Sequence, residues 1–224
     1  MSFFEALVKY APDLLRGLYL TIELTLISAI VGFVFAVPLV LAVIYGNKFF
    51  KNISKAYITV VRGTPLLVQL FFVYYGLPSI GINVTPFTAA LIGFLLNSAA
   101  YQAEYMKGGF LSITTEQMEA AYSIGMSKWQ SIKEIIFPQA FRFSIPALSN
   151  EMIYLIKYTS IAYIIQVEEL FAQAKYFASD TFYHLEIFLL IGAVYLILVY
   201  GVTWSSDWLE EKLKIPGFDV SHLK

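Results

Sequence analysis

The chain has 224 residues, of which 58% are hydrophobic and only 14% are charged, and its formal net charge is −1. A soluble domain usually contains roughly 45–50% apolar and about 25% charged residues, so this chain has too few polar side chains to cover a soluble core. It contains no cysteine, which excludes disulfide scaffolds and thiolate metal sites, and it lacks the basic excess of a nucleic-acid binder. The composition therefore predicts an integral membrane protein.

Long apolar segments divide the chain into spans. A helix that crosses the hydrocarbon core needs about 20 mostly apolar residues. Residues 24–47 contain no charge, and the uncharged stretch over 63–103 is too long for one crossing and is broken by the turn-rich residues 76–86. The sequence predicts an all-α membrane protein with five transmembrane helices, which cover residues 18–47, 57–77, 86–106, 145–167 and 187–206.

The positions of the basic residues predict the orientation, because lysine and arginine in short loops stay on the cytoplasmic side. Such residues follow span one and separate span three from span four, whereas the loop between spans two and three contains none. The N-terminus is therefore expected outside and the C-terminus in the cytoplasm. Residues 1–16 place apolar side chains on one stripe, which predicts an amphipathic helix on the outer surface. The transmembrane domain would cover 17–210, and a cytoplasmic tail would cover 211–224.

The segment between spans three and four is predicted to form two short cytoplasmic helices. Capping boxes that start at Thr114 and Ser127 begin these helices. Gly125 supplies a left-handed residue that ends the first helix, and Pro138 is expected to end the second. Each helix has an apolar stripe, so the pair either packs back on the bundle or docks a cytoplasmic partner. The predicted helices cover residues 115–124 and 128–136.

This cytoplasmic segment, taken as residues 114–138, also resembles a known family. Residues 119–138 are similar to the EAA loop of ABC importer permeases, written E-A-A-x3-G-x9-I-x-L-P, with Phe137 in place of the usual leucine. The resemblance extends over about residues 17–210. Five further segments resemble the polar amino acid uptake branch, although Tyr158 stands where aspartate is usual, and Lys107 and Glu116 replace the usual arginine and glycine. These segments are residues 62–69, 101–104, 107–109, 138–142 and 157–160.

The resemblance implies the membrane subunit of an ATP-driven importer that moves polar amino acids by alternating access; Glu151 points to basic ones, and glutamine or histidine fits almost as well. Such permeases pair as two membrane subunits, identical or paralogous, and each subunit binds one cytoplasmic ABC ATPase. An extracytoplasmic amino acid-binding protein delivers the substrate. The EAA helix is the coupling helix, which sits in a groove of the ATPase. By this resemblance the ATPase-coupling residues are Glu119, Ala120, Ala121 and Gly125.

Energy for transport is expected from another chain. The sequence contains no G-x-x-x-x-G-K-[ST] motif, so we expect neither an enzyme nor a cofactor or metal site here, and ATP and Mg²⁺ would be bound by the partner ATPase. The expected location is the cell membrane of a prokaryote. A self-contained secondary transporter or channel for small polar solutes is the alternative, although such carriers often have internal repeats that this sequence lacks. A membrane enzyme is less favoured, because no Ser/His/Asp arrangement is present.

Charged side chains inside the spans need partners, because a charge at bilayer depth costs about 2.5–3.5 kcal/mol. Arg62 and Glu104 fall at a similar depth in spans two and three. Glu23 and Lys157 both fall in the outer half of the membrane, in spans one and four. We therefore expect two intramembrane ion pairs, Arg62–Glu104 and Glu23–Lys157.

Polar side chains near the midplane are candidates for the substrate site, because transporter sites lie at that depth. Glu151 would attract the cationic end of a substrate, either an α-amino group or a basic side chain. Asn97 and Gln69 would donate hydrogen bonds to an α-carboxylate. A structural role for Glu151, or the handling of protons and water, stays open. The predicted substrate-binding residues are Glu151, Asn97, Gln69, Asn150, Tyr154 and Tyr101.

Small residues recur on one face of span one. Ser28, Gly32 and Ala36 follow one another at four-residue spacing, which permits close approach of another helix. That helix belongs either to the same chain or to a second subunit, and the spacing is compatible with both.

Overall fold

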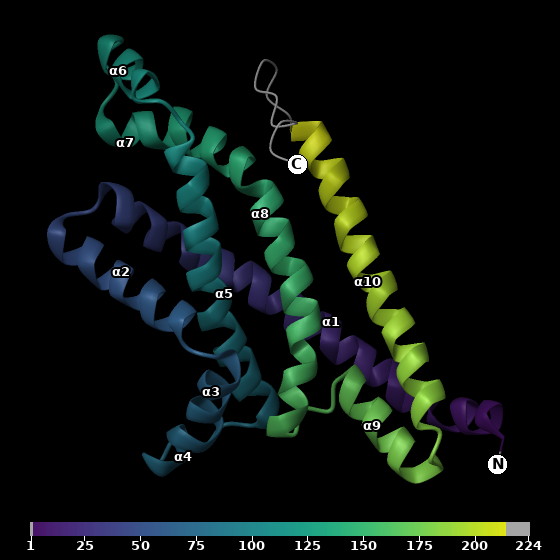
Figure 1. Ribbon diagram of the computed structural model, residues 1–224. Coiled ribbons are helices and arrows are strands. Elements are labelled where there is room, and N and C mark those ends of the chain that lie inside the picture. The colour runs from purple at the N-terminus through teal and green to yellow at the C-terminus, as the bar shows by residue number, and fades with distance from the viewer. Residues whose placement is uncertain (1, 214–224) are drawn as a thin grey trace.

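In a computed structural model of the protein, residues 2–213 are described, and they form helices and short connections with no strand among them (Figure 1). Three long helices run side by side along the molecule: α5 (Pro86–Leu111), α8 (Phe137–Tyr158) and α10 (His184–Leu213). Helix α1 (Phe3–Tyr45) crosses them at an oblique angle. The all-α prediction is confirmed. The part of the predicted tail over 214–224 lies outside the described residues.

Helix α1 is a single helix of 43 residues. It begins with a capping box in which the Ser2 side chain accepts a hydrogen bond from the Glu5 backbone and Glu5 accepts one from the Ser2 backbone. The predicted surface helix over 1–16 is thus continuous with the first span, and residue 16 is not a helix boundary. Gly17 lies inside this helix and allows α9 to pack closely on it: a Cβ atom at Gly17 would lie 2.8 Å from Cγ of Gln173.

The predicted second span over 57–77 is not one straight helix. Helix α2 (Lys48–Gly63) ends at Thr64, and the chain turns by 105° into α3 (Leu66–Phe71), the π-helical turn η1 (Phe72–Gly76) and α4 (Leu77–Ser79). The cause is Pro65, which lacks an amide hydrogen and forces the preceding residue out of the helical region. Thr64 accordingly has φ −112° and ψ 140°. Lys48, Lys51 and Lys55, which were expected in the loop after span one, therefore lie on helix α2.

Helix α5 begins close to where the sequence placed span three. The Thr85 side chain accepts a hydrogen bond from the Thr88 backbone, and Pro86 occupies the first turn, where no amide donor is needed. Helix α5 packs against α1 and α8. Its contact with α8 depends on Gly109, because a Cβ atom there would collide with the Ser144 hydroxyl and the Ala140 carbonyl oxygen.

The two short helices expected between spans three and four protrude beyond the ends of α5 and α8 as a tip made of α6 (Thr115–Ser123) and α7 (Lys128–Ser131) (Figure 1). Gly125 between them has φ +83°, as the elbow requires. The capping box that starts at Ser127 is present. The one predicted at Thr114 is not: its side chain makes no cap, and its hydrogen bond to Glu116 lowers the pKa of that carboxyl group.

Pro138 does not end the second of these two helices, contrary to the prediction. The chain passes from α7 through the π-helical turn η2 (Ile132–Ile136) directly into α8. In this wider turn the Phe137 amide donates to the Ile132 carbonyl oxygen, five residues back, and Pro138 falls in the first turn of α8. The tip is therefore joined to α8 without a loop.

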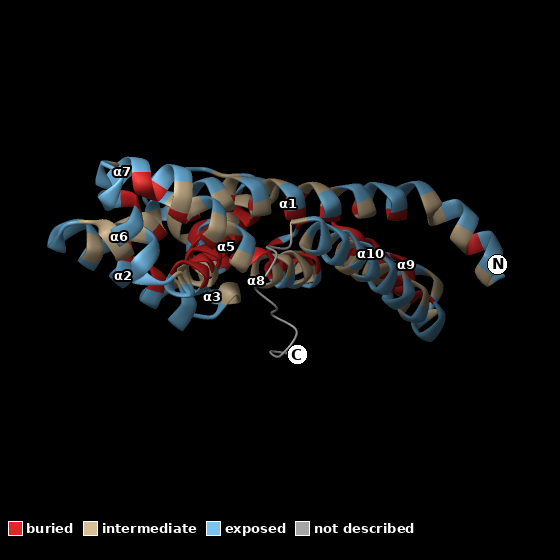
Figure 2. Ribbon diagram, turned by 90° about the horizontal axis from the view of Figure 1, so that it is seen from above, coloured by how far each residue is buried: buried red, intermediate tan, exposed pale blue. Residues whose placement is uncertain are grey.

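The chain between α8 and α10 differs from the predicted loop. Helix α8 begins at Phe137, earlier than the start predicted at residue 145, and after Tyr158 the chain continues as the 3-10 helix η3 (Thr159–Ile165). Helix α9 (Leu170–Thr181), which the sequence did not predict, packs against α1 and α10. Figure 2 shows the buried residues concentrated where α1, α5 and α8 lie next to one another, whereas α10 and the tip are largely exposed. Helix α10 covers the predicted fifth span.

By length and composition, α1 and α10 are able to cross a membrane, and the bent pair of α2 with α3–α4 makes a third crossing if it counts as one span. These findings cover only residues 2–213. The structure thus supports a membrane-type helical fold.

Candidate functional site

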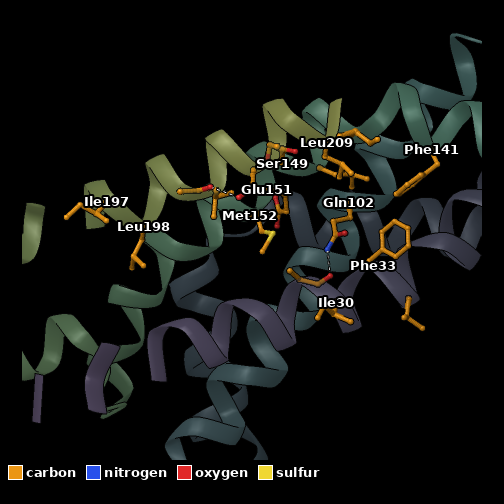
Figure 3. Close-up of a pocket in the computed structure, with 18 residues that line it drawn as sticks. Ile30, Phe33, Gln102, Phe141, Ser149, Glu151, Met152, Ile197, Leu198 and Leu209 are labelled. Atoms are coloured by element: carbon orange, nitrogen blue, oxygen red, sulfur yellow. Dashed lines mark hydrogen bonds between the residues drawn. The ribbon is translucent and has the colours of Figure 1, made fainter. Parts of the chain in front are cut away.

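Glu151 lies on α8 at the edge of a cavity of about 760 Å³ between α1, α5, α8 and α10. Its side chain is buried, with 5% of its surface exposed, and the Ser98 hydroxyl of α5 lies beside the carboxyl group. Figure 3 shows Glu151 and Met152 facing the cavity, with Gln102 across from them. Among residues 2–213 no lysine or arginine forms an ion pair with Glu151. A buried carboxylate with no cationic partner is suited to bind a cation.

Four tyrosines of α5 and α8 form two pairs near the same carboxylate, but none of them lines the cavity. Tyr154 and Tyr158 of α8 stack with ring centroids 6.0 Å apart, and Tyr101 and Tyr105 of α5 lie 6.2 Å apart. Tyr105 and Tyr158 each lie within electrostatic reach of Glu151, Tyr101 and Tyr154. Aromatic faces attract cations, and two of these rings already have one: Arg62 lies over the Tyr101 ring and Lys157 over the Tyr154 ring. The sequence prediction missed Tyr105, although its four-residue spacing from Tyr101 placed it on the same face.

The two predicted amide donors bind other protein groups. The Gln69 side-chain nitrogen donates to the carbonyl oxygens of Val61, at 2.7 Å, and Thr64, at 3.0 Å. Asn97, which is buried, donates to the Gln69 side-chain oxygen at 3.2 Å. Together they fix the bend between α2 and α3 and tie it to α5. Asn150 is exposed and does not line the cavity.

One of the two expected ion pairs is formed. Nη1 of Arg62 lies 3.6 Å from Oε2 of Glu104, and the guanidinium group lies over the Tyr101 ring, 5.3 Å from its centroid. Lys107 joins the pair from the same helix, 2.9 Å from Oε1 of Glu104. The sequence reasoning missed Lys107, although its three-residue spacing from Glu104 allows the contact.

The expected pair of Glu23 and Lys157 is not present in the described part of the chain. The ammonium group of Lys157 instead lies over the Tyr154 ring, 4.6 Å from its centroid. The oblique path of α1 explains the difference, because this part of α1 packs against α9: the Thr21 hydroxyl accepts a hydrogen bond from the Leu170 backbone.

Comparison with known proteins then decides the family. Residues 20–215 match the family model of the binding-protein-dependent transport system inner membrane component. The chain belongs to this permease family. The probable amino-acid permease YxeN of Bacillus subtilis (strain 168) is 39% identical over 219 residues, with 95% of this chain and 96% of that protein covered. The probable amino-acid ABC transporter permease PatM of Vibrio harveyi is 40% identical over 219 residues, with 94% and 96% covered.

A solved structure agrees with this assignment. The crystal structure of an amino acid ABC transporter with histidines superposes with a TM-score of 0.86 at 33% identity, and the match covers 95% of this permease and 99% of that chain. Membership of this family does not favour the self-contained secondary transporter or channel that the sequence left as an alternative.

Small residues of the permease serve packing within one chain. A Cβ atom on Gly32 would lie 3.1 Å from the Gln102 side-chain nitrogen and 3.2 Å from the Ser98 side chain, so α1 and α5 are in close contact there. The Gln102 side chain also donates to the Ala29 carbonyl oxygen at 3.0 Å. The face that includes Ser28 and Gly32 therefore supports the packing of α1 on α5.

The tip of the permease presents an exposed surface. Ala121 is buried, whereas Glu119, Ala120 and Gly125 are exposed. Three large side chains on the tip are also accessible, namely Tyr122, Ile124 and Trp129. The ammonium group of Lys128 donates to the carbonyl oxygen of Tyr45, the last residue of α1, at 3.2 Å. The tip is thus fixed to α1 and α8 at its base and accessible at its end.

No cluster of three or more His, Asp and Glu side chains suited to a metal ion occurs within the range 2–213.

Proposed function

We propose that this permease is the membrane subunit of an ATP-driven importer that moves polar amino acids across the cell membrane by alternating access. The family match and the amino-acid permease names of its relatives support transport of this substrate class. The observation that carries the substrate assignment is the buried Glu151 carboxylate, which faces a cavity with no cationic partner among the described residues.

The surroundings of Glu151 favour a substrate with a basic side chain. The carboxylate attracts an ammonium or guanidinium group. The solved relative that is named as holding histidines is consistent with a cationic substrate. Tyr101 and Tyr154 reach substrate only if Arg62 and Lys157 leave their rings, and Gln69 and Asn97 only if they release their present hydrogen bonds.

The helix lengths support five spans, and the distribution of basic residues supports an N-terminus outside and a C-terminus in the cytoplasm. The spans would be α1, the bent pair of α2 with α3 and α4, α5, α8 and α10. Helix α5 has 26 residues and α8 has 22, which at about 1.5 Å per residue is enough to cross a hydrocarbon core of about 30 Å. In this orientation the basic residues of α2 and of the tip lie on the cytoplasmic side.

The tip would be the coupling element that binds a separate ATPase, with Glu119, Ala120, Ala121 and Gly125 at the contact. Its accessible apolar side chains and its uninterrupted junction with α8 support this role. ATP and Mg²⁺ would be bound by the ATPase subunits. A second permease subunit and an extracytoplasmic amino acid-binding protein would complete the importer.

The substrate assignment is tested by replacing Glu151 with glutamine. The assembled transporter in proteoliposomes should take up arginine and lysine with a KM higher on the order of 30-fold or more, because the charge partner of the substrate is lost. Glu186→Gln removes an exposed carboxylate at the start of α10 and serves as the control. An equal loss for glutamine would place Glu151 at the α-ammonium group. Unchanged uptake of all three amino acids would contradict a contact between Glu151 and substrate.

A further inference from the structure

Helix α2 has two different flanks beside the face that packs on the protein. Its basic residues at positions 48, 51, 55 and 62 are separated by three, four and seven residues. At 3.6 residues per turn these positions fall on one stripe about 60° wide. The helix contains no acidic residue. Arg62 pairs with Glu104, but no acidic side chain of residues 2–213 pairs with the three lysines.

The opposite flank of α2 is apolar and exposed. Phe49 has 66% of its surface exposed, Ile53 has 52% and Val60 has 62%. Phe50 extends this flank and packs edge to face against Phe49, with ring centroids 5.5 Å apart. Large apolar side chains clustered in this way on a surface mark a site that contacts a partner or a membrane.

The face of α2 that packs on the rest of the protein determines which way the basic and the apolar flank point. Ser54 and Ile58 are buried against the protein, and the Tyr57 hydroxyl donates to the Leu96 carbonyl oxygen of α5 at 2.6 Å. The Gln69 hydrogen bonds hold the end of the helix at the 105° bend. Helix α2 therefore cannot rotate to bury its apolar flank while the rest of the fold is kept.

We infer that the first half of α2, residues 48–55, lies at the membrane interface, where the span begins, and binds anionic phospholipid: Lys48, Lys51 and Lys55 contact the headgroups, and Phe49, Phe50 and Ile53 contact the acyl chains. A helix with lysines on one side and aromatic and aliphatic residues on the other has this preference in general. The family is described as an inner membrane component, and the anionic lipid surface of such a membrane attracts the unpaired lysines. Each lysine near such a surface strengthens binding by about fivefold.

The position of α2 is tested by spin labels, for which the absence of native cysteine is an advantage. Ile53→Cys and Lys55→Cys are introduced separately into the permease, which is assembled with cysteine-free partner subunits in nanodiscs that contain phosphatidylglycerol. A nitroxide at position 53 should be accessible to oxygen and shielded from a nickel chelate, and one at position 55 should show the reverse. A label at position 53 that is shielded from both reagents would contradict the inference, because a protein partner would then cover the flank.

The lipid class is tested by the selectivity of the same complex for spin-labelled phosphatidylglycerol over phosphatidylcholine. The double variant Lys51→Gln/Lys55→Gln should lower this selectivity by about 25-fold, since each lysine contributes about fivefold. Lys133→Gln is the matched control, because Lys133 is exposed and lies in the turn that joins the tip to α8. Equal losses in the double variant and the control, or no loss in either, would overturn the assignment of α2 as the lipid site.

Discussion

At the scale of single residues, Gly108 and Gly109 are neighbours on α5 with different surroundings. A Cβ atom on Gly109 would collide with the Ser144 hydroxyl and the Ala140 carbonyl oxygen of α8, whereas one on Gly108 would meet nothing within 4 Å. We expect Gly109→Ala to lower the free energy of unfolding by about 1–3 kcal/mol, because α5 and α8 are forced apart. Gly108→Ala should be neutral or stabilising by up to about 1 kcal/mol. Thermal unfolding in nanodiscs measures both, and equal effects would contradict the close contact.

Gln69 offers a second test at this scale, which separates a structural role from a substrate contact. Gln69→Leu removes the donors to Val61 and Thr64 and the acceptor for Asn97, so the unfolding temperature should fall. The KM for arginine of the folded fraction should stay within about twofold. Val68→Leu, at an exposed neighbouring position, is the control. A raised KM at unchanged stability would show that Gln69 binds substrate.

The candidate site could be predicted only in part from the sequence. Glu151 was identified because a carboxylate in an apolar span needs a partner or a function, and its burial agrees with that reasoning. Gln69 and Asn97 were also identified, but their partners depend on the 105° bend, which no hydropathy pattern reports. The pairing of Glu23 with Lys157 was wrong because equal depth does not specify which helices are neighbours.

At the scale of elements, the π-helical turn η2 sets how the tip is oriented on α8. Pro138→Ala restores an amide donor, so this turn is expected to relax toward α-helical geometry. Each residue of register that changes would rotate the tip by about 100° around the α8 axis. We expect the assembled transporter to hydrolyse several times more ATP for each substrate molecule imported, because the tip is misaligned. Glu134→Gln, which alters only an exposed side chain of the turn, is the control, and an unchanged ratio in Pro138→Ala would contradict a role of η2 in alignment.

Elements with strong local signals agreed best with prediction. Helix α5 begins at Thr85 and Pro86, and the elbow at Gly125 has the positive φ that its glycine indicates. Pro65 and Pro138 show why the other helix boundaries could not be predicted from local sequence. Pro65 breaks a helix inside an apolar run that reads as one span, whereas Pro138 is accommodated by a π-helical turn and breaks nothing.

At the scale of the whole molecule, α8 connects the tip to the candidate substrate site. Pro138 and Glu151 lie on the same helix, separated by roughly 20 Å at 1.5 Å per residue. The hydrogen bond from the Lys128 ammonium group to the Tyr45 carbonyl oxygen connects the tip to α1, a second helix that lines the cavity. In the proposed coupling role, a force applied to the tip would be transmitted along α8 and α1 toward Glu151.

The most direct measurement is uptake of radiolabelled arginine into proteoliposomes that contain the permease, its ATPase subunits and the binding protein. We expect accumulation only when all components and ATP are present, and we expect it to stop when the ATPase is inactivated by a mutation in its own nucleotide site. Accumulation by the permease without the ATPase, driven by an ion gradient alone, would contradict the assignment of this chain as the membrane subunit of an ATP-driven importer.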